Sequence, residues 1–135
     1  MANYYCTCRT NYFKVKDEKA FRGWAGNYEL EIIEGQGGFG FIGNDADGAG
    51  WPTNVYNEKT EDWDDVDFFG EVSKHLAEDA VAIFMEAGAE KARYIIGYAV
   101  AINAKGERKE VCINDIYGLA KQLTNKPAEI TVAKY

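Results

Sequence analysis

Hydrophobic and polar positions alternate most regularly between residues 79 and 113, where strand patterns follow one another along the chain. In residues 80–85 apolar side chains occupy both parities, which is typical of a strand covered on both faces. In residues 94–102 bulky side chains share one parity, so the strand has one bulky face and one smooth face. The smooth face carries Gly97, Ala99 and Ala101. We expect this stretch to form the centre of a sheet.

Further strands are expected on either side of that centre. The turn at residues 103–106 predicts that a strand folds straight back along residues 107–113. Earlier in the chain, residues 4–9, 28–32 and 39–42 also have strand patterns.

Two short amphipathic helices are expected in the first half of the chain. The first follows Asp17, a favourable N-cap residue, and ends near Gly26. The second is capped by Asp64 or Asp65 and carries an apolar stripe through residues 66–76. Acidic residues in its first turn match the helix dipole.

A third helix is expected near the end of the chain, starting at Asn114 or Asp115. Its apolar residues recur at helical spacing and are expected to be buried: Ile116, Leu119, Ala120 and Leu123. Ile130 and Val132 then predict a closing strand.

The predicted order is strand, helix, two strands, helix, three strands, helix, strand. This order is typical of the α+β class, with the helices on one face of a mostly antiparallel sheet of about six or seven strands. A length of 135 residues fits a single domain over residues 1–135.

The net charge of −7 argues against direct binding to nucleic acid or to anionic membranes, since both depend on clustered basic residues. Half of the acidic residues, 11 of 22, fall in residues 44–79 beside only Lys59 and Lys74. We therefore predict a non-enzymatic acidic surface that binds a basic protein partner. Its predicted residues are Asp45, Asp47, Trp51, Tyr56, Glu61, Asp62, Trp63, Asp64, Asp65 and Asp67. If that partner normally binds nucleic acid, the carboxylates could occupy its phosphate-binding channel, as a DNA mimic does.

The chain has no apolar run approaching the roughly 18 residues of a membrane span and no secretory pattern at its start, so we expect a soluble, cytoplasmic protein. Three cysteines in such a chain favour reduced thiols over a disulfide framework. The sequence leaves the oligomeric state undecided, and a homodimer is compatible with it.

Two glycine-containing motifs have simpler interpretations than a ligand site. Residues 35–40 match GxGxxG, but they continue as a strand and open no helix, so a hairpin turn is favoured over nucleotide binding. Residues 45–48 suggest a calcium loop, but an EF-hand register places Gly43 and Asn54 where Asp and Glu are required. Weak cation binding by this acidic region remains an alternative to a solvated loop.

A zinc site can be drawn from Cys6, Cys8, Cys112 and His75, but the spacing of the two strand cysteines is poor for a zinc knuckle. Buried structural cysteines are favoured. No cofactor, metal-ligand set or catalytic residue is predicted.

The alternative function is a small enzyme or ligand-binding domain with a pocket over the smooth strand face at Gly97. Glu86 and Glu90 lie near the adjoining turn and are its candidate polar residues. Cross-strand ion pairing is the competing interpretation of these two carboxylates.

Three segments carry a resemblance to a known group of proteins: NYFKVKDEKAFRGW, HLAEDAVAIFMEAGAEKARYIIGYAVAINAKGE and NDIYGLAKQL. Together they resemble small, mostly uncharacterised accessory proteins of bacterial plasmids, prophages and integrative elements. The resemblance implies an accessory role in a mobile element, such as interference with a host defence system. It supplies no catalytic residues.

Overall fold

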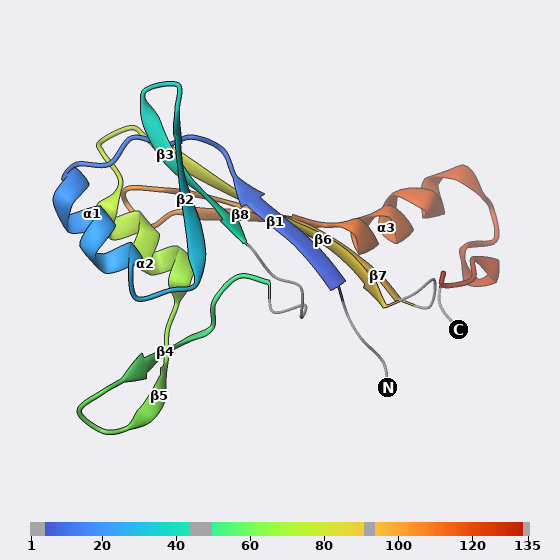
Figure 1. Ribbon diagram of the computed structural model, residues 1–135. Helices are drawn as coiled ribbons and strands as arrows, with labels where there is room; N and C mark the ends of the chain where they lie inside the picture. The colour runs from blue at the N-terminus through green and yellow to red at the C-terminus, as the bar shows by residue number, and fades with distance from the viewer. Residues whose placement is uncertain (1–4, 44–49, 91–93, 134–135) are drawn as a thin grey trace.

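A computed structural model describes residues 5–43, 50–90 and 94–133 of the chain (Figure 1). Within these residues it has eight strands and three α-helices. The predicted α+β class with a mostly antiparallel sheet is confirmed.

Six strands form one sheet in the order β2-β3-β1-β6-β7-β8, and all neighbouring strands are antiparallel. The strands are β1 (Tyr5–Thr10), β2 (Leu30–Gly35), β3 (Gly38–Gly43), β6 (Val81–Glu90), β7 (Tyr94–Asn103) and β8 (Arg108–Cys112). The longest pairing joins β6 to β7, from Val81 opposite Asn103 to Glu90 opposite Tyr94. The strands predicted from residues 79–113 are therefore the inner strands β6 and β7 and the edge strand β8.

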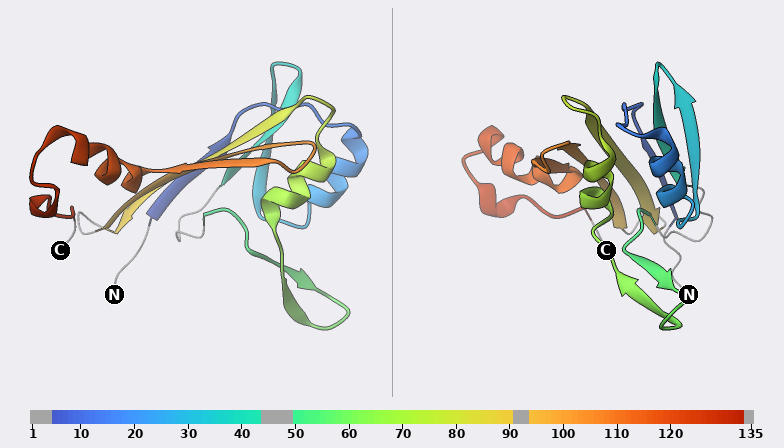
Figure 2. Two further views of the ribbon diagram at one scale, coloured as in Figure 1. Left: turned by 180° about the vertical axis from the view of Figure 1, so that it is seen from behind. Right: turned by 90° about the vertical axis from the view of Figure 1, so that its left-hand side faces the viewer.

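Helices α1 (Glu18–Ala25) and α2 (Phe68–His75) cover one face of this sheet near one of its ends (Figures 1 and 2). Asp17 caps α1 as predicted, because its Oδ1 accepts the Ala20 N–H at 3.1 Å. The core between helices and sheet is aromatic. Phe21 of α1 packs on Phe41 with ring centroids 5.5 Å apart, and Phe68 of α2 packs on Phe84 at 5.9 Å.

The opposite face of the sheet is open. Side chains alternate along β6, so Ala82 and Phe84 are buried under the helices while Val81 and Met85 are 44% and 57% exposed. The prediction that this strand is covered on both faces is wrong for the described residues, since only one layer of helices is present. An apolar face is left facing solvent.

Strands β4 (Asn54–Asn57) and β5 (Asp62–Asp65) form a separate hairpin that projects from the body (Figure 1). Because residues 62–65 are a strand, α2 starts at Phe68 after its N-cap Asp67, and the prediction that Asp64 or Asp65 caps this helix is wrong.

The end of the chain forms an arm, residues 113–133, at the opposite end of the sheet from α1 and α2 (Figure 1). It contains η1 (Ile113–Asp115), α3 (Ile116–Ala120), η2 (Lys121–Leu123) and η3 (Pro127–Glu129). The predicted burial of its apolar residues is wrong, because Ile116, Leu119 and Leu123 are 55%, 58% and 89% exposed. The short helix lies beyond the core, so its apolar stripe has no surface to pack on within the described chain. No strand forms at residues 130–132.

None of the helices formed by the described residues has the length and apolar character needed to cross a membrane.

Candidate functional site: the acidic hairpin

The acidic hairpin, residues 54–65, is closed by the side chain of Asn57. Its Oδ1 accepts the backbone N–H groups of Lys59 at 2.9 Å and Thr60 at 3.4 Å, and its Nδ2 donates to Asp64 Oδ2 at 2.9 Å. Asparagine favours turns because its side chain can bond to the backbone two residues on. At the base of the hairpin, the Val66 N–H donates to the Thr53 carbonyl at 3.0 Å.

The two faces of the hairpin differ in chemistry. Tyr56 lies opposite Trp63, and because side chains alternate along a strand these two rings share one face while Asp62 and Asp64 point to the other. The rings meet edge to face, 5.4 Å apart at 61°. Tyr56 is 48% exposed and Trp63 is 61% exposed, so a large aromatic pair faces solvent. Exposed Trp and Tyr are typical anchors of protein interfaces.

The hairpin has an excess of negative charge. Lys59 is its single basic residue, against five carboxylates at Glu58, Glu61, Asp62, Asp64 and Asp65. All five residues are exposed, and none of them forms an ion pair with another described residue. Their charges therefore act outward on any approaching partner.

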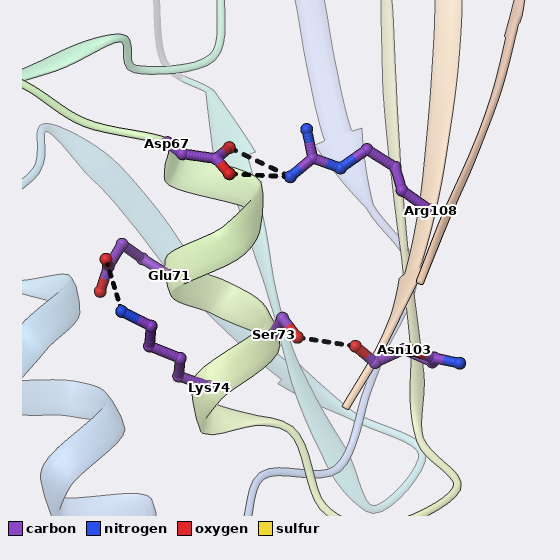
Figure 3. Close-up of polar contacts among 6 residues, drawn as sticks. All are labelled: Asp67, Glu71, Ser73, Lys74, Asn103 and Arg108. Carbon is purple, nitrogen blue, oxygen red and sulfur yellow. Dashed lines mark hydrogen bonds and ion pairs between the residues drawn. The ribbon is translucent and has the colours of Figure 1, made fainter. Parts of the chain in front are cut away.

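Asp67, which was predicted to belong to the same surface, is already paired. The Arg108 guanidinium donates from Nη2 to both of its carboxylate oxygens, at 3.1 and 2.9 Å (Figure 3). Arg108 also lies over the Phe69 ring at 5.6 Å. This contact links the start of α2 to β8, so Asp67 serves the fold.

Helix α2 is held to the sheet by a second polar contact. The buried Ser73 donates its hydroxyl to the Asn103 carbonyl at 2.8 Å, and Lys74 pairs with Glu71 at 3.1 Å on the exposed side (Figure 3). The Ser73 bond fixes α2 to β7, whereas the Lys74–Glu71 pair lies within the helix itself.

Trp51 and Phe68 attach the two ends of the hairpin segment to the core. Their rings stack 6.1 Å apart at 15°, and Trp51 meets Phe84 edge to face at 5.2 Å. Trp51 was predicted as a partner-binding residue, but it is only 4% exposed and packs in the core. The prediction that Trp51 contacts a partner is corrected: Trp51 packs in the core and fixes the position of the hairpin.

Glu86 also fixes the start of the hairpin segment. Its Oε1 accepts the Trp51 N–H at 3.3 Å and the Tyr98 hydroxyl at 3.1 Å. Gly50, with a φ of 67°, lies against this carboxylate where a side chain would clash. The buried carboxylate thus holds the backbone where the chain leaves the core.

A groove of about 580 Å³ separates the aromatic face of the hairpin from the body. Tyr56 and Trp63 line it from the hairpin, and Tyr28, Leu30 and Pro52 line it from outside the hairpin. Burial, and to a smaller extent the charge of Glu71, raises the pKa of the Tyr28 hydroxyl. The groove can hold a flat or elongated side chain between aromatic surfaces.

The structure does not bring the alternative set of Glu86, Glu90 and Gly97 together. Glu86 and Glu90 are four residues apart on one strand, about 13 Å, which is too far for paired acid and base chemistry. Glu86 bonds to Tyr98 on the face under the helices, whereas Gly97 lies opposite Ala87 on the other face. An open, mainly apolar depression of about 450 Å³ lies at Gly97.

The cysteines are separated by the sheet register. Cys8 lies opposite Glu86, Glu86 opposite Tyr98, and Tyr98 opposite Cys112. Three strand spacings amount to about 14 Å, which keeps Cys8 and Cys112 apart. His75 stacks on Trp24, with ring centroids 4.8 Å apart.

The clustering of acidic residues predicts one acidic region but does not resolve its parts. Glu58 was counted among the acids without being assigned to the surface, although its place in the turn beside Glu61 could have indicated it. The pairing of Asp67 with Arg108 had no signal in the local sequence. Asp45 and Asp47 lie outside the described residues.

Comparison of the chain with protein-family models, with curated proteins and with solved structures finds no match.

Proposed function

We propose that this chain is a non-enzymatic binding module that engages a basic protein partner through the acidic hairpin. The observation that carries the proposal is the set of five exposed carboxylates without an ion pair among the described residues, on a hairpin that also exposes Tyr56 and Trp63. Acidic surfaces steer basic partners over long range, and exposed aromatic rings supply short-range contact area.

Each face of the hairpin has its own role in this proposal. Asp62 and Asp64 attract lysine and arginine side chains, and carboxylates bind the arginine fork through paired hydrogen bonds. Trp63 and Tyr56 accept a guanidinium over their ring faces. An arginine-rich surface fits the two faces better than a lysine-rich one, because the planar guanidinium can pair with carboxylates on one face and, from another arginine, stack on the rings of the other.

Arginine-rich surfaces occur on proteins that bind nucleic acid, where arginine and lysine contact the phosphates. In our proposal the carboxylates of the hairpin compete with those phosphates. If the resemblance to accessory proteins of mobile elements holds, the partner would be a nucleic-acid-binding protein of a host defence system.

The test is affinity capture from a host lysate, treated with nuclease, at low and high salt. The test variant neutralises the five hairpin acids: E58Q, E61Q, D62N, D64N and D65N. The control variant neutralises five exposed acids elsewhere: E31Q, E78Q, D79N, E110Q and E129Q. Each variant loses five negative charges from the wild-type net charge of −7, so the two variants have equal net charge.

We expect the wild type and the control variant to capture the same basic protein at low salt and to release it at high salt. The hairpin variant should capture none of it. Equal capture by both variants would rule out the hairpin as the binding surface.

A further inference from the structure

Among the residues that the structure describes, no layer covers either face of the end of the sheet far from α1 and α2 (Figures 1 and 2). Ile95 and Ile96 are consecutive residues of β7, so their side chains point to opposite faces, and they are 55% and 42% exposed. Strands with apolar residues on both faces are normally covered on both. We call residues 87–90 and 95–97 the bare end of the sheet.

The C-terminal arm also exposes apolar side chains that are not part of the hydrophobic core. Five of its large apolar side chains are between 49% and 89% exposed: Ile113, Ile116, Leu119, Leu123 and Val132. The arm is nevertheless closed on itself, because the Tyr117 hydroxyl accepts the Ala133 N–H at 2.7 Å. It is an ordered segment whose apolar side chains have no cover within the described chain.

We propose that a second copy of this chain supplies the missing cover, and that the arm of each copy packs on the bare end of the other. Such an exchange is isologous, so one two-fold axis covers both arms and both bare ends. The depression of about 450 Å³ at Gly97, lined by Ile96, Val111 and Ile113, can receive an apolar side chain of the partner's arm. The absence of a side chain at Gly97 keeps this depression open.

The apolar area is large enough for a stable dimer. The seven side chains already named are at least 42% exposed. At roughly 100 Å² for each side chain, the arm and the bare end can bury roughly 700 Å² per chain. Two chains then bury roughly 1,400 Å² in total, within the range of about 1,200–2,000 Å² of specific, stable interfaces.

The concentrated negative charge of the acidic hairpin does not oppose this association. The five hairpin acids lie toward the helix end of the molecule, away from the arm (Figure 1). Dimerisation rests on the arm and the bare end alone, so it stands or fails independently of the acidic hairpin.

Sedimentation equilibrium of the full chain tests this proposal. We expect the wild type to sediment as two 15.1 kDa chains at micromolar concentration. An arm variant, L119D with L123D, and a sheet variant, I95D, should each halve the apparent mass, because a charge replaces an exposed apolar contact. The control variant Q122D with N125D adds two charges at exposed polar positions of the same arm and should remain a dimer.

A mixture of the arm and sheet variants tests the exchange itself. The intact arm of I95D can pack on the intact sheet of L119D/L123D, so the mixture should form heterodimers, although each variant alone is monomeric. Circular dichroism confirms that both variants are folded. A monomeric wild type, dimers that survive both sets of substitutions, or a mixture that stays monomeric would overturn the proposal.

Discussion

The acidic hairpin and the C-terminal arm both leave the main sheet, but they differ in how they are attached and in what they expose. The hairpin is anchored at both ends, by Trp51 and Phe68, and it exposes carboxylates with two aromatic rings. The arm is attached at one end and exposes aliphatic side chains. Exposed charge costs little in water, whereas exposed aliphatic side chains favour burial, so the two segments call for partners of different chemistry.

The largest expected effect separates the anchor of the hairpin from its tip. Trp51→Ala removes a buried ring from the core and should lower the free energy of unfolding by about 3–5 kcal/mol. Trp63→Ala removes an exposed ring and should lower it by less than about 1 kcal/mol. Urea unfolding at one fixed protein concentration measures both. Similar losses for the two variants would mean that the hairpin belongs to the core.

An intermediate effect separates Asp67 from the hairpin acids. Arg108→Met breaks the pair with Asp67, and because both groups are partly solvated the expected loss of stability is about 0.2–1 kcal/mol. Capture of the basic partner should be retained, since the five hairpin carboxylates are unchanged. Stronger capture by a folded Arg108→Met variant, whose Asp67 carboxylate is no longer neutralised, would show that Asp67 can join the binding surface.

These differences mark how far the sequence could predict the fold. The alternation in residues 80–102 predicted the inner strands because a period of two is a property of the strand itself. Strand β5 was missed because aspartate is depleted in strands and common at helix N-termini. Its structure depends on pairing with β4, including the contact of Tyr56 with Trp63, which local sequence does not encode.

The arm shows a second limit of the same kind. The spacing of Ile116, Leu119 and Leu123 indicates that these side chains share one face, but it does not indicate which surface covers that face. For the candidate site, charge clustering predicted the acidic region. Charge clustering could not show that Asp64 is free of ion pairs among the described residues while Asp67 is paired, because Arg108, the partner of Asp67, lies 41 residues away in the sequence.

The smallest expected effect concerns the helix-covered half, which contains the single histidine. Burial, assisted by the positive charge of Lys16, lowers the pKa of His75. The folded state therefore prefers the neutral ring more than the unfolded state does, and the unfolded state binds more protons. This contribution to stability is complete above about pH 6.5 and is lost as the pH falls toward the folded-state pKa.

His75→Phe should reduce the decline in urea midpoint between about pH 8 and about pH 5. An identical decline in the wild type and the variant would assign the pH dependence to other groups.

Calorimetric titration with an arginine-rich peptide separates the hairpin from the overall charge of the chain. The wild type and the variant with five acids neutralised elsewhere should bind this peptide equally, with affinity that falls steeply as salt rises. The hairpin variant should bind on the order of tenfold more weakly at low salt and lose most of the salt dependence. If the two variants, which carry the same net charge, bind with equal affinity, the acidic hairpin is not the binding surface.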